Sequence, residues 1–324
     1  MNNNNNPLIS VRILTYNSAK YVLETLESVK AQTYPTIELI VSDDCSSDYT
    51  VELCENWIKN NQKRFIRCVL LTSPVNTGVA PNSKRSLDAV QGEWIKGLAA
   101  DDCLEERAIE TFVNFVMKNE CDICVSGMIR INENGQEIKT IKGSVYDSYI
   151  TELKKTYEKQ LSSIYNKLFI PGPATFYSTR MLKNIGGYSD AYPFADEWPF
   201  FFKVLNCGYR IFPLEDKLIR YRVCASISHK NGSIGLVNER VINSSCLFFK
   251  NEVKKVMIQK KMYFSLWHSM IYFFCKKVQI GNSKFLLMLS VLLFLTSPKF
   301  YINGIGNIYN YLIYLKLLLA GKSK

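Results

Sequence analysis

The last quarter of this 324-residue chain lacks acidic residues almost entirely. Residues 241–324 contain twelve lysines, no arginine and one acid, Glu252, whereas residues 1–240 hold equal numbers of basic and acidic residues. The net charge of +11 therefore belongs to the C-terminal segment alone. Because the first part is neutral, it has no basic footprint for DNA or RNA, and we expect no nucleic-acid partner.

The chain also lacks an apolar run of the ~20 residues that a helix needs to cross a bilayer. The basic segment has three shorter apolar or aromatic stretches instead, at Met262–Phe274, Phe285–Leu295 and Tyr309–Ala320. Lysines beside Trp, Tyr and Phe are typical of segments that lie on an anionic membrane surface. We therefore expect residues 241–324 to form a helical tail that binds a membrane peripherally or monotopically. The alternative is a helical subdomain with a solvated lysine face.

The ten cysteines lack the spacing of a disulfide framework or a zinc finger. Their irregular positions, and an N-terminus without a signal-peptide pattern, lead us to expect reduced thiols in the cytoplasm. Cys121 and Cys124 have the spacing of a metal-binding pair, but no second pair follows. We expect both to be buried structural residues.

What the sequence does contain, after a leader over residues 1–7 that we expect to be disordered, is an alternation of strand and helix patterns. Such alternation predicts an α/β fold, a Rossmann-like and mainly parallel sheet flanked by helices. Strands are expected at Leu8–Leu14, Ile37–Ser42, Arg67–Leu71, Glu93–Leu98 and Asp122–Ile131, with helices over 21–29, Tyr49–Ile58, Asn82–Val90 and Glu106–Met117. The pattern changes after Asn134-Gly135, and the stretch to about residue 166 is expected to be a connector or lid.

Two pairs of acids close apolar runs of this predicted sheet, Asp43-Asp44 and Asp101-Asp102. Open α/β sheets bind ligands at the carboxyl ends of their strands. Clustered carboxylates are costly there unless a cation or hydrogen-bond donors meet them, and a divalent metal that carries a diphosphate satisfies that need. The acids therefore predict a nucleotide site.

Four segments in this order resemble the family-2 glycosyltransferases of the GT-A fold, over roughly residues 8–225. They are Leu8–Asn17 with the following Ala31–Pro35, the strand end Ser42–Asp48, the strand end Ala99–Asp102, and Gly186-Gly187-Tyr188 with the following Asp196–Trp198. The resemblance implies transfer of a sugar with inversion from a nucleotide diphosphate sugar, with a divalent metal, Mg²⁺ or Mn²⁺. It makes residues 8–132 the nucleotide-sugar-binding half and residues 133–240 the acceptor-binding and catalytic half.

For the donor, Asp44 is the candidate to accept a hydrogen bond from a pyrimidine ring N–H, in preference to Asp43, and Thr15 and Tyr16 would wall the base. Asn17 belongs to the same set. Asp101 would face the ribose, and Asp101 and Asp102 the metal. The alternative for Asp43, Asp44 and Asp48 is that they cap the following helix, which we favour for Asp48.

The chain departs from the family pattern at two positions. Ala99 replaces the first acid of an Asp-x-Asp motif, so only the adjacent pair remains. Ser83 replaces an arginine often found in the helix after the third strand, which leaves Lys84 and Arg85 as candidate diphosphate contacts. The alternative is that both are solvated helix charges.

Inverting transfer needs a base for the acceptor hydroxyl, and Glu197 is the best candidate. The order of the family's acidic pair is inverted here to Asp196-Glu197, and the alternative is that both residues cap the next helix. Trp198 would offer a ring to an acceptor sugar or pack in the core. His229 would reach metal or diphosphate or lie at the surface.

These expectations describe an enzyme that moves a sugar, from a UDP-sugar, to a polyprenyl-diphosphate-linked saccharide. Its place would be the cytoplasmic face of the inner membrane, in bacterial O-antigen or capsule synthesis, because the tail is similar to those of such enzymes. The alternatives are a non-catalytic nucleotide-sugar-binding scaffold and a sugar nucleotidyltransferase.

Overall fold

The computed structural model describes residues 6–138, 145–165, 170–189, 191–195, 197–223 and 239–280. Its contacts divide the chain into two units, Met1–Cys224 and Ala225–Lys324, which are described separately below. The boundaries at residues 132 and 240 that the sequence suggests stay predictions.

The first unit is built on one sheet of eight strands in the order β3-β2-β1-β4-β7-β6-β8-β5. The strands are β1 Ile9–Thr15, β2 Ile37–Asp43, β3 Arg67–Thr72, β4 Trp94–Ala99, β5 Cys103–Leu104, β6 Ile123–Ile131, β7 Thr175–Ser178 and β8 Phe212–Arg222. Strands β1 and β2 are almost wholly buried, as expected for parallel strands that are covered by helices on both faces.

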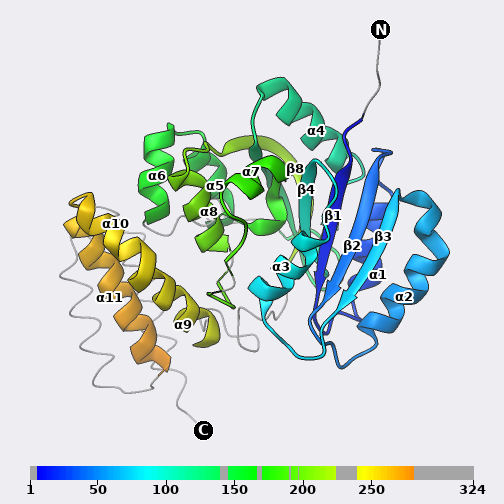
Figure 1. Ribbon diagram of the computed structural model, residues 1–324, viewed down its shortest axis with the longest axis horizontal. Coiled ribbons are helices and arrows are strands. Elements are labelled where there is room, and N and C mark those ends of the chain that lie inside the picture. Colours follow the sequence, from blue (N-terminus) through cyan, green and yellow to red (C-terminus); the bar gives the residue numbers. More distant parts are fainter. Residues whose placement is uncertain are drawn as a thin grey trace. The chain divides into compact units, whose positions relative to one another are not determined.

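Four helices of the first half pack on this sheet (Figure 1). They are α1 Val22–Lys30, α2 Thr50–Asn61, α3 Val79–Asp88 and α4 Ala108–Asn119. The last of them, α4, lies against β6 and β8. The chain steps outward from β1 to β3 and then back to β4, so right-handed crossovers place α1 and α2 on one face and α3 on the other. The strand and helix predictions for residues 8–131 are confirmed, with ends displaced by a few residues.

The sheet is mainly parallel, as expected: β1 pairs parallel with β2 and β4, β2 with β3, and β6 with β8. The antiparallel pairings lie beyond β4. Strand β7 runs antiparallel between β4 and β6, and β5 runs antiparallel to β8. Strand β7 lies between β4 and β6, which the crossover through α4 would otherwise have made neighbours. Strand β7 has only four residues, Thr175–Ser178, and this is too short for its sequence pattern to predict a strand.

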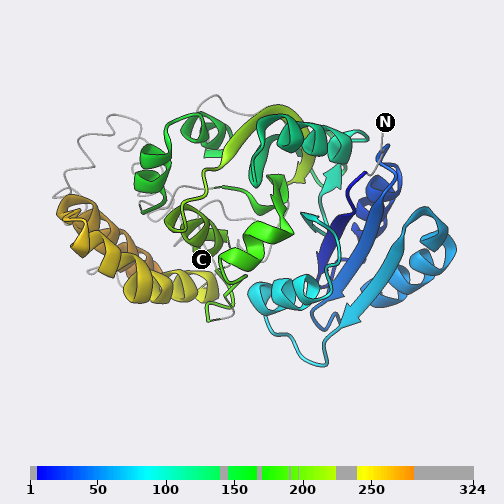
Figure 2. The ribbon, with the colours of Figure 1, turned by 45° about the horizontal axis from the view of Figure 1, so that its top comes forward.

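The stretch expected to be a connector or lid contains two helices, α5 Val145–Leu153 and α6 Tyr157–Tyr165. Helix α6 packs beside α8, Glu197–Asn206, as Figure 2 also shows. The ring of Tyr165 meets that of Phe202 edge-on at 5.7 Å. Helices α5 and α6 bury apolar residues such as Leu153 and Ile164. The many Lys and Tyr residues of the stretch obscure this helical pattern in the sequence. The short elements η2 Gly172–Ala174 and α7 Thr179–Asn184 complete this half.

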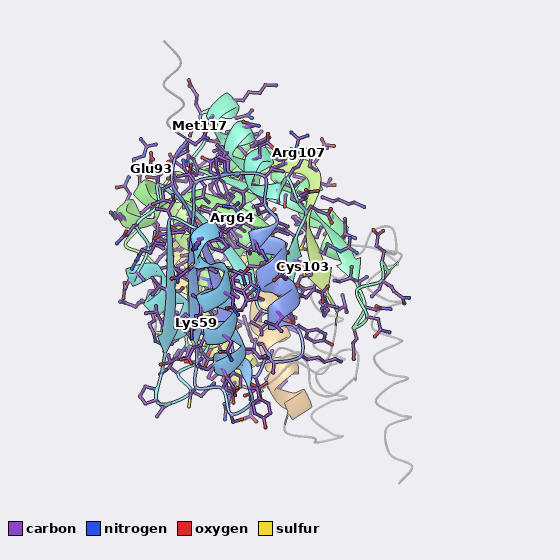
Figure 3. The ribbon with its side chains drawn as sticks, turned by 90° about the vertical axis from the view of Figure 1, so that its right-hand side faces the viewer. Lys59, Arg64, Glu93, Cys103, Arg107 and Met117 are labelled. Atoms are coloured by element: carbon purple, nitrogen blue, oxygen red, sulfur yellow. The ribbon has the colours of Figure 1, made fainter. Side chains whose placement is uncertain are left out.

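Arg64, which is labelled in Figure 3, holds the motif Ala31–Pro35 through hydrogen bonds to its backbone. This residue ends the short turn η1, Gln62–Arg64, after α2. Its guanidinium donates hydrogen bonds to backbone carbonyls of four residues between α1 and β2: Lys30, Gln32, Tyr34 and Pro35.

At the amino ends of the strands, the sheet encloses the carboxylate of Glu38 on β2. It accepts hydrogen bonds from the Ser10 hydroxyl, from the backbone N–H groups of Gln91 and Gly92 at 2.7 and 3.0 Å, and from Arg67 at 3.1 Å. The buried charge is therefore satisfied by donors of the chain itself.

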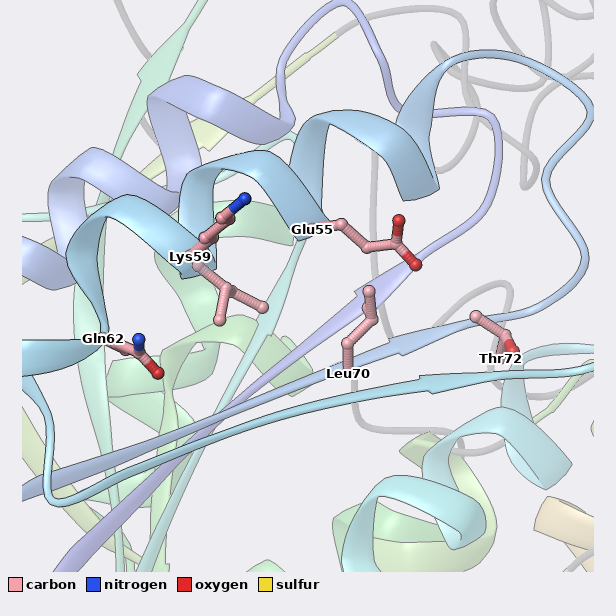
Figure 4. Close-up of a pocket in the computed structure, with 6 residues that line it drawn as sticks. Glu55, Lys59, Gln62, Leu70 and Thr72 are labelled. Atoms are coloured by element: carbon pink, nitrogen blue, oxygen red, sulfur yellow. The ribbon is translucent and has the colours of Figure 1, made fainter.

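A hollow of about 400 Å³ lies between α2 and the edge strand β3 (Figure 4). Glu55, Lys59 and Gln62 line it from the helix side and Leu70 and Thr72 from the strand. No candidate site residue lines this hollow.

In the second unit, the described residues form α9 Glu239–Phe248, a π-helical turn Phe249–Val253, α10 Lys254–Gln259 and α11 Tyr263–Ile280. Among the described helices, none combines the length and apolar character that a membrane span requires. The stretches Phe285–Leu295 and Tyr309–Ala320 lie outside the described residues.

Candidate active site

The two acidic pairs flank the carboxyl end of strand β1. The backbone N–H of Ala100 donates to the carbonyl of Leu14 at 3.2 Å, and that of Asp44 donates to the carbonyl of Thr15 at 3.0 Å. Because these carbonyls are consecutive, the loops after β4 and β2 leave the sheet on either side of β1. The structure thus brings the acids to one edge, as the sequence predicts.

The carboxylate of Asp44 binds the loop that leads into α3. Its oxygens accept hydrogen bonds from the Thr77 and Gly78 N–H groups at 2.9 and 2.7 Å, from the Thr77 hydroxyl at 2.5 Å and from Arg85 at 3.3 Å. Asp44 is buried, so a nucleobase that binds here must share the carboxylate with this loop. The structure shows the position of Asp44 and leaves its role in donor binding a prediction.

Asp43 and the residues after β1 form a second network beside it. Asp43 accepts hydrogen bonds from the hydroxyls of Thr15 at 2.7 Å and Ser46 at 2.5 Å. Asn17, in the left-handed region with φ 49°, donates from its N–H to Ser46 and accepts from the N–H of Ser47. Tyr16, the residue before Asn17, is 37% exposed.

Asp48 joins the same loops at the start of α2. It accepts from the N–H groups of Ala19 and Thr50 at 3.1 Å and from the Thr50 hydroxyl. Partial burial acts to raise the pKa of Asp48, but these hydrogen bonds outweigh it and lower the pKa. Asp48 thus binds the first residue of α2, in line with the capping role favoured from the sequence, although the N-cap residue of α2, Tyr49, makes no side-chain cap.

The two candidate diphosphate residues point to different places. Arg85 donates to the carbonyl of Asp43 at 3.1 Å and to the Asp44 carboxylate, so its charge lies at the strand ends. Lys84 forms an ion pair of 2.8 Å with Asp88 on the same helix. The structure therefore brings Arg85 into the cluster and does not bring in Lys84.

Asp101 and Asp102 form the turn after β4, and Arg222 at the end of β8 holds that turn. Arg222 donates its N–H to Asp102 Oδ1 at 2.9 Å and its guanidinium to the Asp101 carbonyl at 2.9 Å. The other oxygen of Asp102, Oδ2, is enclosed and has no hydrogen-bond partner among the described residues. Burial, and then the charge of Asp101, raise the pKa of Asp102 well above its ordinary value.

These features fit a divalent cation, because an enclosed carboxylate oxygen without a donor gains most from a positive charge. Within the described residues, no group of three or more His, Cys, Asp or Glu side chains converges as a metal site. Asp101 and Asp102 would therefore hold the ion, with further ligands from the diphosphate or water.

Glu197 is the first residue of α8, and one of its carboxylate oxygens is fixed by the backbone. Oε1 accepts a hydrogen bond of 2.7 Å from the N–H of Gly172. A Cβ atom on Gly172 would lie 2.9 Å from the same oxygen, so the contact depends on glycine. Asp196 and His229 lie outside the described residues.

Trp198 is buried in the acceptor half. Its ring is only 8% exposed, and its indole N–H donates to the carbonyl of Ile164 in α6. This is the geometry of the core-packing alternative, and it leaves little of the ring for a sugar.

The loop before Glu197 is joined to the nucleotide half through α3. The carbonyl of Pro193 accepts a hydrogen bond of 3.1 Å from the N–H of Ala80, in the first turn of α3. Gly78, with φ 97°, lies beneath this contact, and a Cβ there would approach the Pro193 oxygen to 2.9 Å. Gly78 therefore contacts both the Asp44 carboxylate and the loop that leads to Glu197.

Sequence reasoning missed three residues that organise this region: Arg222, Gly172 and Lys96. Lys96 gave a signal, since a lysine interrupts the apolar run of β4. It is fully buried, and burial lowers its pKa to about 7 against the opposing effect of Asp102. Arg222 and Gly172 gave no local signal, because only the fold brings them to the acids.

With this geometry established, comparisons with known proteins identify relatives. Residues 10–186 match the family described as Glycosyl transferase family 2. The chain is 30% identical over 151 residues to the putative teichuronic acid biosynthesis glycosyltransferase TuaG of Bacillus subtilis. The matched segment covers 46% of this chain and 58% of TuaG. The chain is 30% identical over 128 residues to the glycosyltransferase GlyG of Streptococcus pneumoniae, and this match covers 39% of this chain and 41% of GlyG. The chain thus matches less than two thirds of the length of these relatives.

Solved structures with the same fold include that of S. aureus TarS 1-349 in complex with UDP-GlcNAc. The TM-score is 0.57 with 18% sequence identity, and the match covers 92% of each chain. The same fragment in complex with UDP gives a TM-score of 0.54. The mixed α/β sheet flanked by helices is consistent with the GT-A fold.

Proposed function

The chain belongs to glycosyl transferase family 2, and from this we propose that it transfers a sugar from a UDP-sugar to a lipid-linked saccharide, with inversion at the anomeric carbon. The observation that carries the proposal is the pair of acidic turns at the end of β1, in the same unit as a Glu197 carboxylate that the Gly172 N–H holds. The product would be a unit of a bacterial surface polysaccharide, an O-antigen or a capsule.

The named relatives support a UDP-sugar and a polysaccharide. TarS has been crystallised with UDP and with UDP-GlcNAc, and the name of TuaG refers to teichuronic acid synthesis. The lipid-linked acceptor is inferred from the basic, aromatic second unit, since a polyprenyl diphosphate would lie at a membrane surface.

Each group of residues has a defined task in this proposal. The loops held by Asp43 and Asp44 would bind the nucleoside, with Tyr16 against the base and Arg85 near the diphosphate. A divalent ion bound by Asp101 and Asp102 would supply positive charge to the diphosphate as it leaves. Glu197 would accept the proton of the acceptor hydroxyl while that oxygen attacks the anomeric carbon.

The direct test is mass spectrometry of the products from a panel of UDP-sugars, with a polyprenyl-diphosphate saccharide as acceptor and Mg²⁺ or Mn²⁺ present. We expect one donor to extend the acceptor by one sugar, with UDP released. Donor binding without transfer to any acceptor would favour the scaffold alternative. That alternative is considered because Ala99 replaces the first acid of the Asp-x-Asp motif. Release of diphosphate from a nucleoside triphosphate would favour the nucleotidyltransferase.

For the second unit we propose peripheral binding to an anionic membrane through α11. One side of this helix exposes apolar and aromatic side chains: Tyr263, Phe264, Trp267, Met270 and Phe274. Phe264 is 74% exposed, and Lys260 and Lys261 stand just before Met262, the residue that precedes the helix. Aromatic side chains beside lysines suit the boundary between lipid headgroups and acyl chains.

Vesicle flotation tests this membrane proposal. The full chain should float with anionic vesicles, release as salt screens the lysine charges over a Debye length of ~8 Å, and lose binding when truncated near Arg240. Phe264→Ser with Trp267→Ser should weaken binding, whereas Ile66→Ser, at an exposed apolar residue of the first unit, should not. Failure of the full chain to bind at low salt would contradict the proposal.

A further inference from the structure

A fully buried lysine joins the nucleotide half of the first unit to its catalytic half. Lys96 lies in β4, with no exposed surface. Its amine donates to the carbonyl of Gly97 at 2.6 Å, to that of Pro173, and to that of Thr175 at 3.5 Å. Two of these three acceptors therefore belong to the segment Gly172–Thr175, which lies 76 or more residues further along the chain.

The segment that Lys96 holds is the one that holds Glu197. It consists of the turn η2, Gly172–Ala174, and the start of β7. The N–H of Gly172 donates to Glu197 Oε1 at 2.7 Å, one residue before the Pro173 carbonyl that Lys96 binds. On the other side, β4 continues from Lys96 directly into the turn of Asp101 and Asp102.

We propose that Lys96 is a positioning residue that sets the place of the Glu197 carboxylate relative to the Asp101-Asp102 turn, by tying η2 to β4. The proposal rests on the proposed role of Glu197 as the base. Lys96 itself is buried away from solvent and acts through the backbone of residues 172–175.

A purely apolar residue would pack in this place but would not hold the turn. Without the amine, the carbonyls of Pro173 and Thr175 lose this donor in a buried environment, so the turn is driven to shift toward other partners. A shift of η2 moves the Gly172 N–H, and with it the carboxylate. A displacement of about 1 Å at a reacting group costs roughly 10²-fold in rate.

The test replaces Lys96 with an apolar residue of similar length. In Lys96→Met we expect kcat to fall about 10- to 100-fold, with the affinity for UDP in metal-free buffer unchanged within about threefold, because the loops of Asp43 and Asp44 are not touched. Hydrogen exchange should rise at residues 170–176 and 197–200 and stay unchanged at residues 43–48. Glu38→Gln, at a buried charge at the opposite end of the sheet, is the matched control and should change none of these quantities except stability.

A double variant separates positioning from general destabilisation. If Lys96 acts through Glu197, Lys96→Met should cost little further activity in a Glu197→Gln background, whereas independent effects would multiply. Gly172→Ala, which crowds the same carboxylate oxygen, should reproduce the loss of kcat and serves as the test if Lys96→Met does not fold.

The proposal is overturned if folded Lys96→Met shows wild-type exchange at residues 170–176, or if the two substitutions multiply in the double variant. It is also overturned if Gly172→Ala keeps the wild-type kcat. If the wild-type chain transfers no sugar, the proposed function fails instead, and the exchange experiment still decides whether Lys96 holds the turn.

Discussion

The guanidinium of Arg12 on β1 donates a hydrogen bond of 2.7 Å to the hydroxyl of Ser83 on α3. Arg12 also donates to Ser86 at 3.1 Å and to the Tyr177 hydroxyl at 3.4 Å, and it is almost wholly buried. The family resemblance would lead one to expect an arginine in place of Ser83. Here the guanidinium that meets the Ser83 hydroxyl comes from β1.

We therefore predict that Arg12→Met destabilises the protein by about 1–3 kcal/mol, because it leaves buried hydroxyls without their charged partner. Exchange of the two residues, Arg12→Ser with Ser83→Arg, should recover part of the loss. Urea denaturation measures both effects. Lys84→Met, on the same helix but exposed, should stay within about 0.5 kcal/mol of the wild type. An Arg12→Met variant as stable as the wild type would show that the hydroxyls need no cation.

The enclosed Asp102 carboxylate should make stability depend on pH. Its pKa in the folded state is raised above 3.8, so as pH rises above that value the unfolded chain loses the proton before the folded one does. The unfolding free energy of the wild type should therefore fall with pH relative to that of Asp102→Asn. Below pH 3.8 the two should run parallel.

The lower unfolding free energy of the wild type at neutral pH should rise again when Mn²⁺ and UDP are added, and that of Asp102→Asn should not. Thermal unfolding measures both. Asp101→Ala and Asp102→Ala should each lower turnover by about 10²-fold or more while the fold survives. Wild-type activity of both variants after metal depletion and restoration would contradict the metal assignment.

Glu197→Gln should lower kcat by about 10²- to 10⁴-fold with nearly normal donor binding, because a base acts on the acceptor. Single-turnover kinetics with saturating donor measures this, and Asp196→Asn is the neighbouring control. A loss confined to Asp196→Asn would move the base one residue toward the N-terminus.

Gly78→Ala should lower activity as well as stability. The positive φ of 97° costs an alanine about 1–2 kcal/mol, and the Cβ would also meet the Pro193 carbonyl at 2.9 Å. Gly208→Ala is a matched control, because Gly208 has φ 92° with nothing within 4 Å of a Cβ. Both variants should melt earlier, but only Gly78→Ala should raise KM for the donor. Equal kinetics in the two would show that the Pro193 contact has no role in donor binding.

The sequence allowed the first half of the fold to be predicted because its signals are local. Apolar runs such as Ile37–Ser42 and the turn Asn76-Thr77-Gly78 are read within a few residues. Strand β7 was missed because its place in the sheet is set by contacts far apart in sequence. Helices α5 and α6 were missed because Lys and Tyr residues obscure their apolar pattern. Antiparallel pairing of a four-residue strand leaves no periodicity to detect.

For the candidate site, sequence located the acids and the glutamate but not what holds them. Asp44 and Asp102 stand at the ends of recognisable strands, so their placement followed from topology. The partners Arg222 and Gly172 come from strand β8 and turn η2, and no spacing links them to the acids. The distinction between Lys84 and Arg85 was equally out of reach, because it depends on which face of α3 meets β2.

At the amino ends of the strands, the carboxylate of Glu38 accepts hydrogen bonds from Ser10, Gln91, Gly92 and Arg67. The acids that we assign to donor and metal stand at the other ends of the same strands. Laboratory evolution toward a different donor sugar can therefore vary loop residues at the carboxyl ends of the strands, with Gly78 kept, while this anchor stays intact. Libraries built in this way should retain a larger folded fraction than libraries that also vary the strand starts.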